Sequence, residues 1–390
     1  MAPAPWTLPS TATLLSGLDP LRHGFVNYNS SFLHYADTTL AEVCRSAGLH
    51  TAAFIANPIL SPGLNFDQGF DEYHELHLAR GSELIAQARP FLEERGDERF
   101  LLYLHLFDPH RPYVPLATDA AALCDPKPPD YTVGDGVALT RALYGGEEVD
   151  ETRRQSAIAF ESQCYDAEVA GCDRALDELL QLLTELSLRE RTVMVITSDH
   201  GEAFGEHGRL GHSNGLYDSM LHVPLLFHGP GVPQGERRSA SVELKDVPRT
   251  LAEVAHLPGA GDLAGSNLLG AGSAPRDGEL LFSSTWLGQQ PFPDEKRLEE
   301  VGRVFRVQSQ DWTLVWTPRG DGEGDDLLEL ISPRDDPFHP INHAADHPEV
   351  ARRLRSAIVT WMTSTQRDRG THLSGEGTLD FLRALGYAGD

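Results

Sequence analysis

An aspartate and a histidine that could bind a metal ion stand together at the end of a predicted strand. Asp199 and His200 directly follow the apolar run 193–196, which is rich in β-branched residues and predicts a buried strand. In an open α/β sheet, ligands bind beyond the carboxyl ends of the strands. Carboxylate oxygen and imidazole nitrogen are common ligands of divalent cations. Asp199 and His200 are therefore candidate metal ligands.

Two more histidines follow this pair in a glycine-rich segment. His207 lies in Gly-Glu-His-Gly, and His212 lies in Leu-Gly-His-Ser-Asn-Gly. Glycines permit a tight irregular loop, which could fold both rings back over the strand end. The apolar run 223–227 then predicts a return to the sheet. The stretch thus predicts a strand, a polar loop loaded with ligands, and a second strand.

The motifs in this stretch resemble those of the sulfatase family of the alkaline-phosphatase superfamily. That family carries Asp-Asn-Gly or Asp-His-Gly at a strand end, then Gly-x-His-Gly, a Lys or His, and a Tyr before a Val-Pro-Leu strand. The matching residues here are Asp199-His200-Gly201, Gly205-Glu206-His207-Gly208, His212, Tyr217-Asp218 and Val223-Pro224-Leu225. The resemblance implies that Asp199 and His200 bind the metal, that His212 is catalytic, and that His207 binds substrate or supports the loop.

The start of the chain resembles the signature of the same family. Thr7 is expected near the beginning of a helix over residues 12–17, where backbone N–H groups favour an anion. In the family, Cys or Ser stands two residues before a Pro, and Thr7 occupies that nucleophile position. Thr11 replaces the arginine of the family. The remaining matches are Pro9, Ser10, Leu15-Ser16-Gly17 and Arg22-His23-Gly24. They imply that Arg22 contributes to substrate binding.

Threonine at the nucleophile position changes the expected chemistry. The family oxidises its Cys or Ser to formylglycine, and Thr7 is not expected to be converted. Its hydroxyl could still attack directly if a metal lowered its pKa, and water would then break the covalent ester. Threonine-bearing phosphodiesterases of the superfamily work in this way. The alternative interpretation makes Thr7 an ordinary N-cap hydroxyl.

A further candidate, His110, follows the apolar run 100–107. The sequence Asp-Pro-His-Arg-Pro-Tyr at 108–113 resembles the His-x-Pro-Tyr of the family, whose histidine contacts the transferred group or the leaving oxygen. Flanking prolines restrict the backbone, which suits a general acid held in place. The alternative is an exposed loop histidine. Farther along, the acidic side chains of Glu168 and Asp173 are expected to be solvated or to act as helix caps.

The composition excludes several classes of function. Of 390 residues, 32 are Lys or Arg and 58 are Asp or Glu, so the net charge is 32 − 58 = −26. Such an excess of acid opposes binding to nucleic acid and to anionic membranes. No stretch is apolar enough to span a membrane. The four cysteines are irregularly spaced and fit neither a zinc site nor a disulfide framework. The expected partner is a small or polymeric anionic ester; localisation and oligomeric state stay open.

The order of predicted elements indicates an α/β fold. The resemblance implies an alkaline-phosphatase-like mixed, mostly parallel sheet flanked by helices, with a smaller C-terminal α+β subdomain. We expect a catalytic domain over 1–265, a linker rich in Gly, Ala and Ser, and a subdomain over 275–390. Short strands are predicted at 279–282, 304–307, 313–316 and 327–331, followed by a helix over 347–365. Strands followed by a helix suggest an antiparallel sheet covered on one face.

The family also carries a strand upstream of the nucleophile that ends in two metal-binding aspartates. Met1 stands six residues before Thr7, so we expect the natural chain to begin farther upstream or this chain to be a fragment. One divalent metal ion is expected as cofactor, with Zn, Mn or Ca as candidates. His200 in place of the asparagine of the family favours Zn or Mn, because Ca prefers oxygen ligands.

Together these features predict a metal-dependent hydrolase of sulfuric esters with Thr7 at the nucleophile position. The overall resemblance favours sulfate esters, whereas the threonine by itself favours the alternative, a phosphodiester or phosphonate monoester hydrolase of the same superfamily. A non-catalytic member that keeps the fold is a third interpretation, motivated by Thr7 and Thr11. Isomerases and mutases on this scaffold bind two metals, and the sequence offers no second Asp-x-x-x-His set for that role.

Overall fold

The computed structural model of the protein describes residues 1–25, 33–128, 131, 150–270, 279–286, 303–318 and 326–365. Its contacts divide the chain into two compact units, which are described one at a time. The first unit comprises 1–43, 62–68 and 193–390, and the second comprises 44–61 and 69–192. The predicted division between residues 265 and 275 is not the border of these units, and it stays a prediction.

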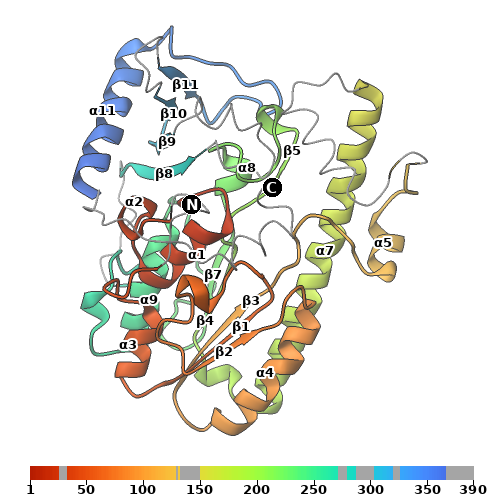
Figure 1. Ribbon diagram of the computed structural model, residues 1–390, viewed down its shortest axis with the longest axis vertical. Helices are drawn as coiled ribbons and strands as arrows, with labels where there is room; N and C mark the ends of the chain where they lie inside the picture. The colour runs from red at the N-terminus through yellow and green to blue at the C-terminus, as the bar shows by residue number, and fades with distance from the viewer. Residues whose placement is uncertain are drawn as a thin grey trace. The chain divides into compact units, whose positions relative to one another are not determined.

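The second unit is built on a parallel sheet of three strands in the order β2-β1-β3 (Figure 1). The strands are β1 (His50–Ile55), β2 (Glu72–Glu75) and β3 (Phe100–His105). The central strand β1 is buried at every residue after His50. The outer strand β3 is only half-buried along its length, although its apolar run predicts full burial. This sheet supplies the parallel part of the expected fold.

Helices cover this sheet. Helix α4 (Gly81–Arg95) packs on β1 and against the long helix α7 (Glu151–Glu185), and α5 (Ala117–Leu123) packs on α7. The sequence predicts one or two helices over 150–186, and the structure has one, which begins after Asp150 accepts a hydrogen bond from the backbone N–H of Arg153. The content of Pro, Asp and Gly over 117–148 predicts a long surface excursion, and most of those residues lie outside the described part of the chain.

The first unit contains the strands that border the histidine-rich loop. Strand β4 (Met194–Thr197) pairs antiparallel with β7 (Leu225–His228), and the short hairpin β5 (Ala203–Phe204) and β6 (Leu210–Gly211) lies between them in the chain. The predicted strand order is confirmed, although β4 is half-buried rather than fully buried. The helices of this unit's N-terminal and central parts are α1 (Thr7–Ser16), α2 (Pro20–His23), α3 (Leu40–Ser46, which crosses into the second unit), α8 (Asp218–Leu221) and α9 (Val247–Val254).

The C-terminal part of the first unit is an antiparallel sheet in the order β11-β10-β9-β8. Its strands are β8 (Leu281–Trp286), β9 (Arg303–Gln308), β10 (Thr313–Thr317) and β11 (Leu327–Ile331). Helix α11 (Pro348–Thr365) lies beside the C-terminal strands in Figure 1. It packs on β9 and β10, and Leu354, Ile358 and Trp361 belong to the core cluster that it shares with them. The predicted antiparallel sheet and its covering helix are therefore confirmed.

This sheet shares a hydrophobic core with the beginning of the chain and with the loop after β6. Ala2, Leu216, Met220, Val304 and Val315 belong to one buried cluster. The C-terminal strands are thus packed directly against the segments that carry the candidate site residues.

Short 3-10 turns complete the described elements. They are Pro62–Leu64, Arg189–Arg191, Glu206–Gly208, Leu244–Asp246 and Ala260–Asp262. Among the residues that the structure describes, no helix is both long and apolar enough to cross a membrane. All four cysteines are free.

Candidate active site

Helix α1 holds Thr7 at its first position. The helix predicted over 12–17 begins five residues earlier, at Thr7. Pro9 is compatible with this start, because it lies in the first turn, where a backbone N–H has no partner within the helix. Trp6 is the N-cap residue, so the alternative in which Thr7 caps the helix is wrong. Thr7 is buried, with 4% of its surface exposed. Its hydroxyl therefore lies at the positive end of a ten-residue helix.

Hydrogen bonds of buried hydroxyls hold α1 in place. Ser10 Oγ donates to the carbonyl of Ala4 at 2.8 Å, and Thr13 Oγ1 donates to that of Leu18 at 2.7 Å. The helix ends at Gly17, whose φ of +74° favours glycine. A Cβ atom at Gly17 would lie 2.7 Å from the carbonyl oxygen of Ala264, so a side chain there would clash with backbone. The motif around Thr7 is thus a rigid support.

Asp199 and His200 leave the end of β4 together. The backbone N–H of His200 donates to Asp199 Oδ1 at 3.0 Å, and His200 Nε2 lies 3.6 Å from Asp199 Oδ2. Gly201 then passes so close to α8 that a Cβ atom would lie 2.3 Å from the carbonyl oxygen of Ser219. Only glycine fits, and the chain turns sharply there with both side chains side by side.

The structure brings Thr7 and His200 together. Thr7 Oγ1 lies 3.4 Å from His200 Nε2, although 193 residues separate them in the chain. His200 Nδ1 donates to the carbonyl of Gly201 at 2.9 Å, so Nε2 is the acceptor of the neutral ring. Burial lowers the pKa of His200, against the opposing charge of Asp199, and keeps the ring neutral. A neutral imidazole with Nε2 facing a hydroxyl can bind a metal or accept a proton.

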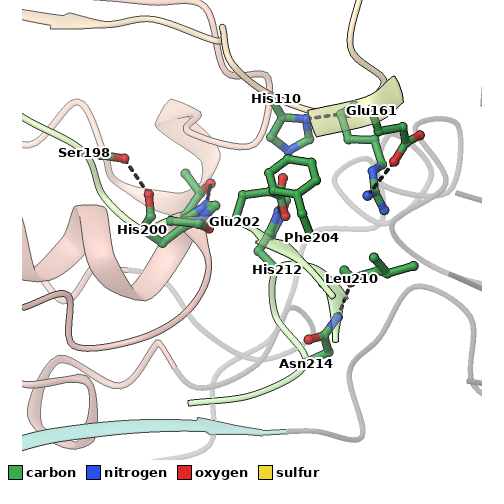
Figure 2. A network of polar contacts seen from close by, with 12 residues as sticks. His110, Glu161, Ser198, His200, Glu202, Phe204, Leu210, His212 and Asn214 are labelled. Atoms are coloured by element: carbon green, nitrogen blue, oxygen red, sulfur yellow. Dashed lines mark hydrogen bonds and ion pairs between the residues drawn. The ribbon is translucent and has the colours of Figure 1, made fainter. Parts of the chain in front are cut away.

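His212 joins this group through the β5–β6 hairpin. Its ring centroid lies 4.5 Å from that of His200 (Figure 2). The next residue, Ser213, donates its backbone N–H to the carbonyl of Pro5 at 2.8 Å, which ties the hairpin to the segment before Thr7. His212 Nδ1 lies 3.1 Å from Glu202 Oε1. Thr7, Asp199, His200 and His212 therefore form one polar cluster within the first unit.

His207 takes a different position from His212. Its ring stacks on Tyr217 with centroids 4.0 Å apart and an angle of 8° between the planes. Its backbone N–H donates to the carbonyl of Pro337 at 2.7 Å, and the Tyr217 hydroxyl donates to Glu329 at 3.0 Å. Burial lowers the pKa of His207 and raises that of Tyr217 to about 12. These contacts brace the glycine-rich loop against the C-terminal sheet; a substrate-binding role for His207 stays a prediction.

Arg22 lies exposed on α2, whereas its neighbour His23 is buried. His23 Nε2 lies 3.0 Å from Thr13 Oγ1, so this histidine contacts the second half of α1. Nothing in these contacts assigns a ligand to Arg22, and its predicted role in substrate binding remains untested.

His110 belongs to the second unit. Its Nδ1 donates to the carbonyl of Arg111 at 2.6 Å, and its ring lies on Phe107 with centroids 4.4 Å apart. The His110 ring is thus held at a strand end, as predicted. Its participation in the cluster around Thr7 stays a prediction.

Buried carboxylates next to His110 escaped the sequence analysis. Arg111 and Glu161 form an ion pair at 2.8 Å with side chains only 9% and 6% exposed. Glu168 accepts from the backbone N–H of Val114 at 2.6 Å, and burial raises its pKa to about 7. The expectation that Glu168 is solvated is wrong. Helical spacing alone could have signalled it, because Glu161 and Glu168 are seven residues apart and share one face of α7.

The residues present fit a divalent cation in kind. Asp199 offers a carboxylate, and the backbone carbonyl of Gly201 holds His200 in the tautomer whose Nε2 can bind a metal. Within the described parts of the chain, however, no three His, Cys, Asp or Glu side chains come together as a complete ligand set. The fit thus rests on two ligands, the same two that the sequence predicts.

Known proteins resemble this chain in sequence. Human arylsulfatase K is 37% identical over 193 residues, which cover 49% of this chain and 34% of that protein. Chicken arylsulfatase K is 34% identical over 239 residues, covering 60% and 41%. The low-salt glycan biosynthesis sulfotransferase Agl7 of Haloferax volcanii is 27% identical over 275 residues, covering 66% and 56%. The chain thus spans well under half the length of the arylsulfatase K relatives.

Solved structures share the fold. The phosphonate monoester hydrolase of Agrobacterium radiobacter superposes with a TM-score of 0.72 at 19% identity, covering 94% of this chain and 88% of that one. The protein BT4656, solved with its substrate D-glucosamine-2-N,6-O-disulfate, superposes with a TM-score of 0.68 at 18% identity, covering 93% and 89%. The predicted alkaline-phosphatase-like fold class is therefore confirmed.

The family model described as Sulfatase matches residues 1–257. That range contains Thr7, the strand end at Asp199 and His200, and the hairpin that carries His212. It ends just before the segment that leads to the C-terminal sheet. The chain belongs to the sulfatase family.

Proposed function

We propose that the protein hydrolyses an anionic ester, in the first place a sulfate ester, with Thr7 as the attacking group. The observation that carries this proposal is the 3.4 Å contact between Thr7 Oγ1 and His200 Nε2 at the first turn of α1. A hydroxyl at a helix N-terminus can approach an anion that the N–H groups bind. Membership of the sulfatase family supports sulfate as the transferred group.

The proposed reaction has two displacements. Thr7 Oγ1 gives up its proton to solvent and forms a bond to sulfur, while the bond from sulfur to the alcohol oxygen breaks and the alcohol leaves with a proton from a protonated histidine. His212 and His110 are the proposed donors of that proton, and Arg22 and His207 are proposed substrate contacts. Water then attacks the sulfur and returns a proton to that histidine, while the bond from sulfur to Thr7 Oγ1 breaks; sulfate is released, and Oγ1 takes a proton from solvent to become a hydroxyl again.

Asp199 and His200 would hold one divalent cation, with Zn, Mn or Ca as candidates. Such an ion would polarise the ester oxygens and lower the pKa of the attacking hydroxyl. The residues of the chain do the rest. Gly201 fixes the His200 ring through its carbonyl, and Ser10 and Thr13 hold the helix that presents Thr7. The substrate can be small or polymeric; because BT4656 has a disulfated glucosamine as its substrate, sulfated sugars are natural compounds to test.

The hydroxyl of Thr7 also supports a second candidate, a phosphodiester or phosphonate monoester hydrolase. The same displacement works at phosphorus, and it needs no conversion of the nucleophile to an aldehyde. The two candidates differ in the charge and the central atom of the transferred group, so parallel assays separate them.

The test uses the full chain with an aryl sulfate, an aryl phosphodiester and an aryl phosphonate monoester, each with added Zn, Mn or Ca. We expect turnover of the aryl sulfate, and metal binding at a ratio of about one ion per chain. Faster turnover of either phosphorus ester would select the second candidate. No turnover of any substrate, together with no metal uptake, would contradict both and favour the non-catalytic interpretation.

A further inference from the structure

One buried carboxylate in the cluster has no role in the reaction proposed above. Glu202 follows Asp199-His200-Gly201 directly and is 5% exposed at its side chain. Its two oxygens lie 3.1 and 3.3 Å from Nδ1 of His212, ten residues later in the chain. Figure 2 shows Glu202 and His212 beside His200. Burying a carboxylate costs free energy unless a hydrogen bond or an ion pair compensates it, and here the compensating group is the ring of a proposed proton donor.

The register of the β5–β6 hairpin produces this contact. Phe204 is opposite Leu210, and Ala203 is opposite Gly211. Continuing the ladder by one step places Glu202 opposite His212. Cross-strand neighbours on one face have their Cβ atoms about 5 Å apart, close enough for a carboxylate to reach an imidazole. The pair is therefore set by backbone pairing and does not depend on a flexible side chain.

Two further contacts keep the hairpin in this register. Gly205 donates its backbone N–H to the carbonyl of Arg209 at 2.8 Å, and Glu206 accepts the backbone N–H of Phe204 at 2.6 Å. Gly205, His207 and Gly208 take positive φ values of 117°, 51° and 66°, which close the loop. The stacking of His207 on Tyr217 anchors the same loop. The position of Glu202 relative to His212 is thus fixed from both ends of the hairpin.

The contact decides which nitrogen of His212 carries the hydrogen. An ionised carboxylate only accepts hydrogen bonds, so the nitrogen facing Glu202 must be Nδ1–H. Proton transfer to or from a substrate would then go through the other nitrogen, Nε2. His200 differs, because its Nδ1 faces the carbonyl of Gly201 instead of a carboxylate. Two neighbouring histidines are therefore oriented by different partners.

We propose that Glu202 is a positioning residue, which accepts from Nδ1–H of His212 and so makes Nε2 the nitrogen that gives a proton to the leaving oxygen and, once it has lost that proton, accepts one from the attacking water. This proposal rests on the proposed function. It assigns Glu202 no contact with the substrate, so substrate binding should depend on it little and turnover strongly. Partners of this kind typically change activity 10- to 100-fold when they are removed.

The test compares Glu202→Ala with Glu202→Gln in the full chain, assayed with the aryl ester that the wild type turns over. The amide oxygen of glutamine can still accept from Nδ1–H, whereas alanine cannot. We expect Glu202→Ala to lower kcat about 10- to 100-fold with little change in KM, and Glu202→Gln to restore most of kcat. Glu206→Gln is the matched control, because that residue lies in the same loop and keeps its bond to Phe204 through the amide oxygen.

A second readout does not depend on turnover. Nitrogen chemical shifts of isotope-labelled histidine, with His212 assigned by His212→Gln, report the tautomer of each ring. We expect Nδ1–H for His212 in the wild type and in Glu202→Gln, and a mixture of tautomers in Glu202→Ala. Circular dichroism and thermal unfolding would verify that each variant is folded.

Two results would overturn the proposal. The first is an unchanged tautomer and an unchanged kcat in Glu202→Ala. The second is a Glu202→Gln variant as slow as Glu202→Ala although its ring keeps Nδ1–H, which would show that the charge acts and the orientation does not. If the wild type turns over none of the esters, the proposed function fails, whereas the tautomer measurement still decides the role of Glu202.

Discussion

Two glutamates, one in each unit, are equally buried but face partners of different chemistry. Glu202 in the first unit faces an imidazole, and Glu161 in the second faces a guanidinium. Both side chains are buried, with exposed fractions of 5% for Glu202 and 6% for Glu161. Arginine is always charged, so Glu161 must stay ionised to compensate it. Histidine can be neutral, so Glu202 need only accept a hydrogen bond.

The difference separates a structural pair from a chemical one. Removing one partner of a buried ion pair leaves the other charge uncompensated, which costs more than the pair itself contributes. Removing the partner of a histidine mainly frees its ring to turn. The first unit should therefore lose activity when its polar cluster is altered, and the second should lose stability.

The largest expected effect comes from Thr7→Val, which tests the chemical side of the comparison. Valine keeps the shape of threonine and removes the hydroxyl that lies 3.4 Å from His200. Loss of a nucleophile in related mechanisms costs on the order of 10³-fold or more in kcat. The melting temperature should stay within a few degrees, because this contact is long for a hydrogen bond.

Ser16→Ala is the control for Thr7→Val. Ser16 lies on the same helix, donates to the carbonyl of Ala12 and accepts from the backbone N–H of Leu18, at the end of the helix away from Thr7, so its loss should leave turnover intact. Wild-type kcat in Thr7→Val would remove Thr7 from the mechanism and leave the cluster around His200 without its proposed nucleophile.

Glu161→Gln tests the structural side. Glu161 pairs with Arg111 at 2.8 Å and also accepts from the hydroxyl of Tyr131 at 2.8 Å. Burial raises the pKa of Tyr131, so this phenol stays a neutral donor. Leaving Arg111 buried without its counter-charge should cost about 3–5 kcal/mol of unfolding free energy. Denaturant unfolding of the full chain measures the loss.

The double variant Arg111→Met, Glu161→Leu sharpens this result. Replacing both charges by apolar groups of similar volume is often close to neutral, so it should lose less stability than Glu161→Gln alone. A double variant that is less stable than the single one would mean that the pair supplies net stability. Glu161 would then stabilise the fold through its charge, beyond merely compensating Arg111.

Glu168 predicts how stability depends on pH. Burial raises its pKa from the ordinary value of 4.5 to about 7, with Asp108 adding repulsion and Arg80 opposing it. Between these two pH values the folded chain binds more protons at this site than the unfolded chain. Its contribution is therefore fully present below pH 4.5 and is lost as the pH rises through about 7.

The measurement compares unfolding free energies of the wild type and Glu168→Gln from pH 4 to 8. We expect the wild type to lose about 1–3 kcal/mol relative to the variant across that range. Glutamine keeps an oxygen that can accept from Val114, so the variant should fold. Parallel curves would show that Glu168 has the same pKa in both states. Glu243, whose pKa burial also raises to about 7, is unchanged in both proteins and cancels in the difference.

Sequence reasoning placed the features that depend on local order in the chain. Asp199 and His200 are adjacent in the chain, and a strand end followed by glycine leaves few ways to place them. A helix after Thr7 was also predicted, although it begins five residues earlier than expected, and so were the C-terminal antiparallel strands, because short apolar runs are local signals.

What the sequence could not show depends on pairing across distance. The contact of Glu202 with His212 depends on the register in which β5 pairs with β6, two strands of only two residues each. A slip of one residue would turn the glutamate to the other face of the hairpin. The pair of Arg111 and Glu161 joins residues 50 apart, and its burial depends on how α7 packs. Both are tertiary facts that charge patterns suggest only weakly.

Thr11→Val gives the smallest expected effect and concerns the helix that presents Thr7. Thr11 lies one turn after Thr7 on α1, is fully buried, and its hydroxyl has no hydrogen-bond partner among the described residues. A buried hydroxyl without a partner costs about 1–3 kcal/mol, so valine should stabilise the chain by roughly 1 kcal/mol. Thermal unfolding measures the gain. The family has an arginine here, so an increase in KM in Thr11→Val would show that the hydroxyl contacts the substrate in its place. An unchanged KM with raised stability would mean that Thr11 only packs in the core, and that Thr7 is the residue of α1 that belongs to the polar cluster.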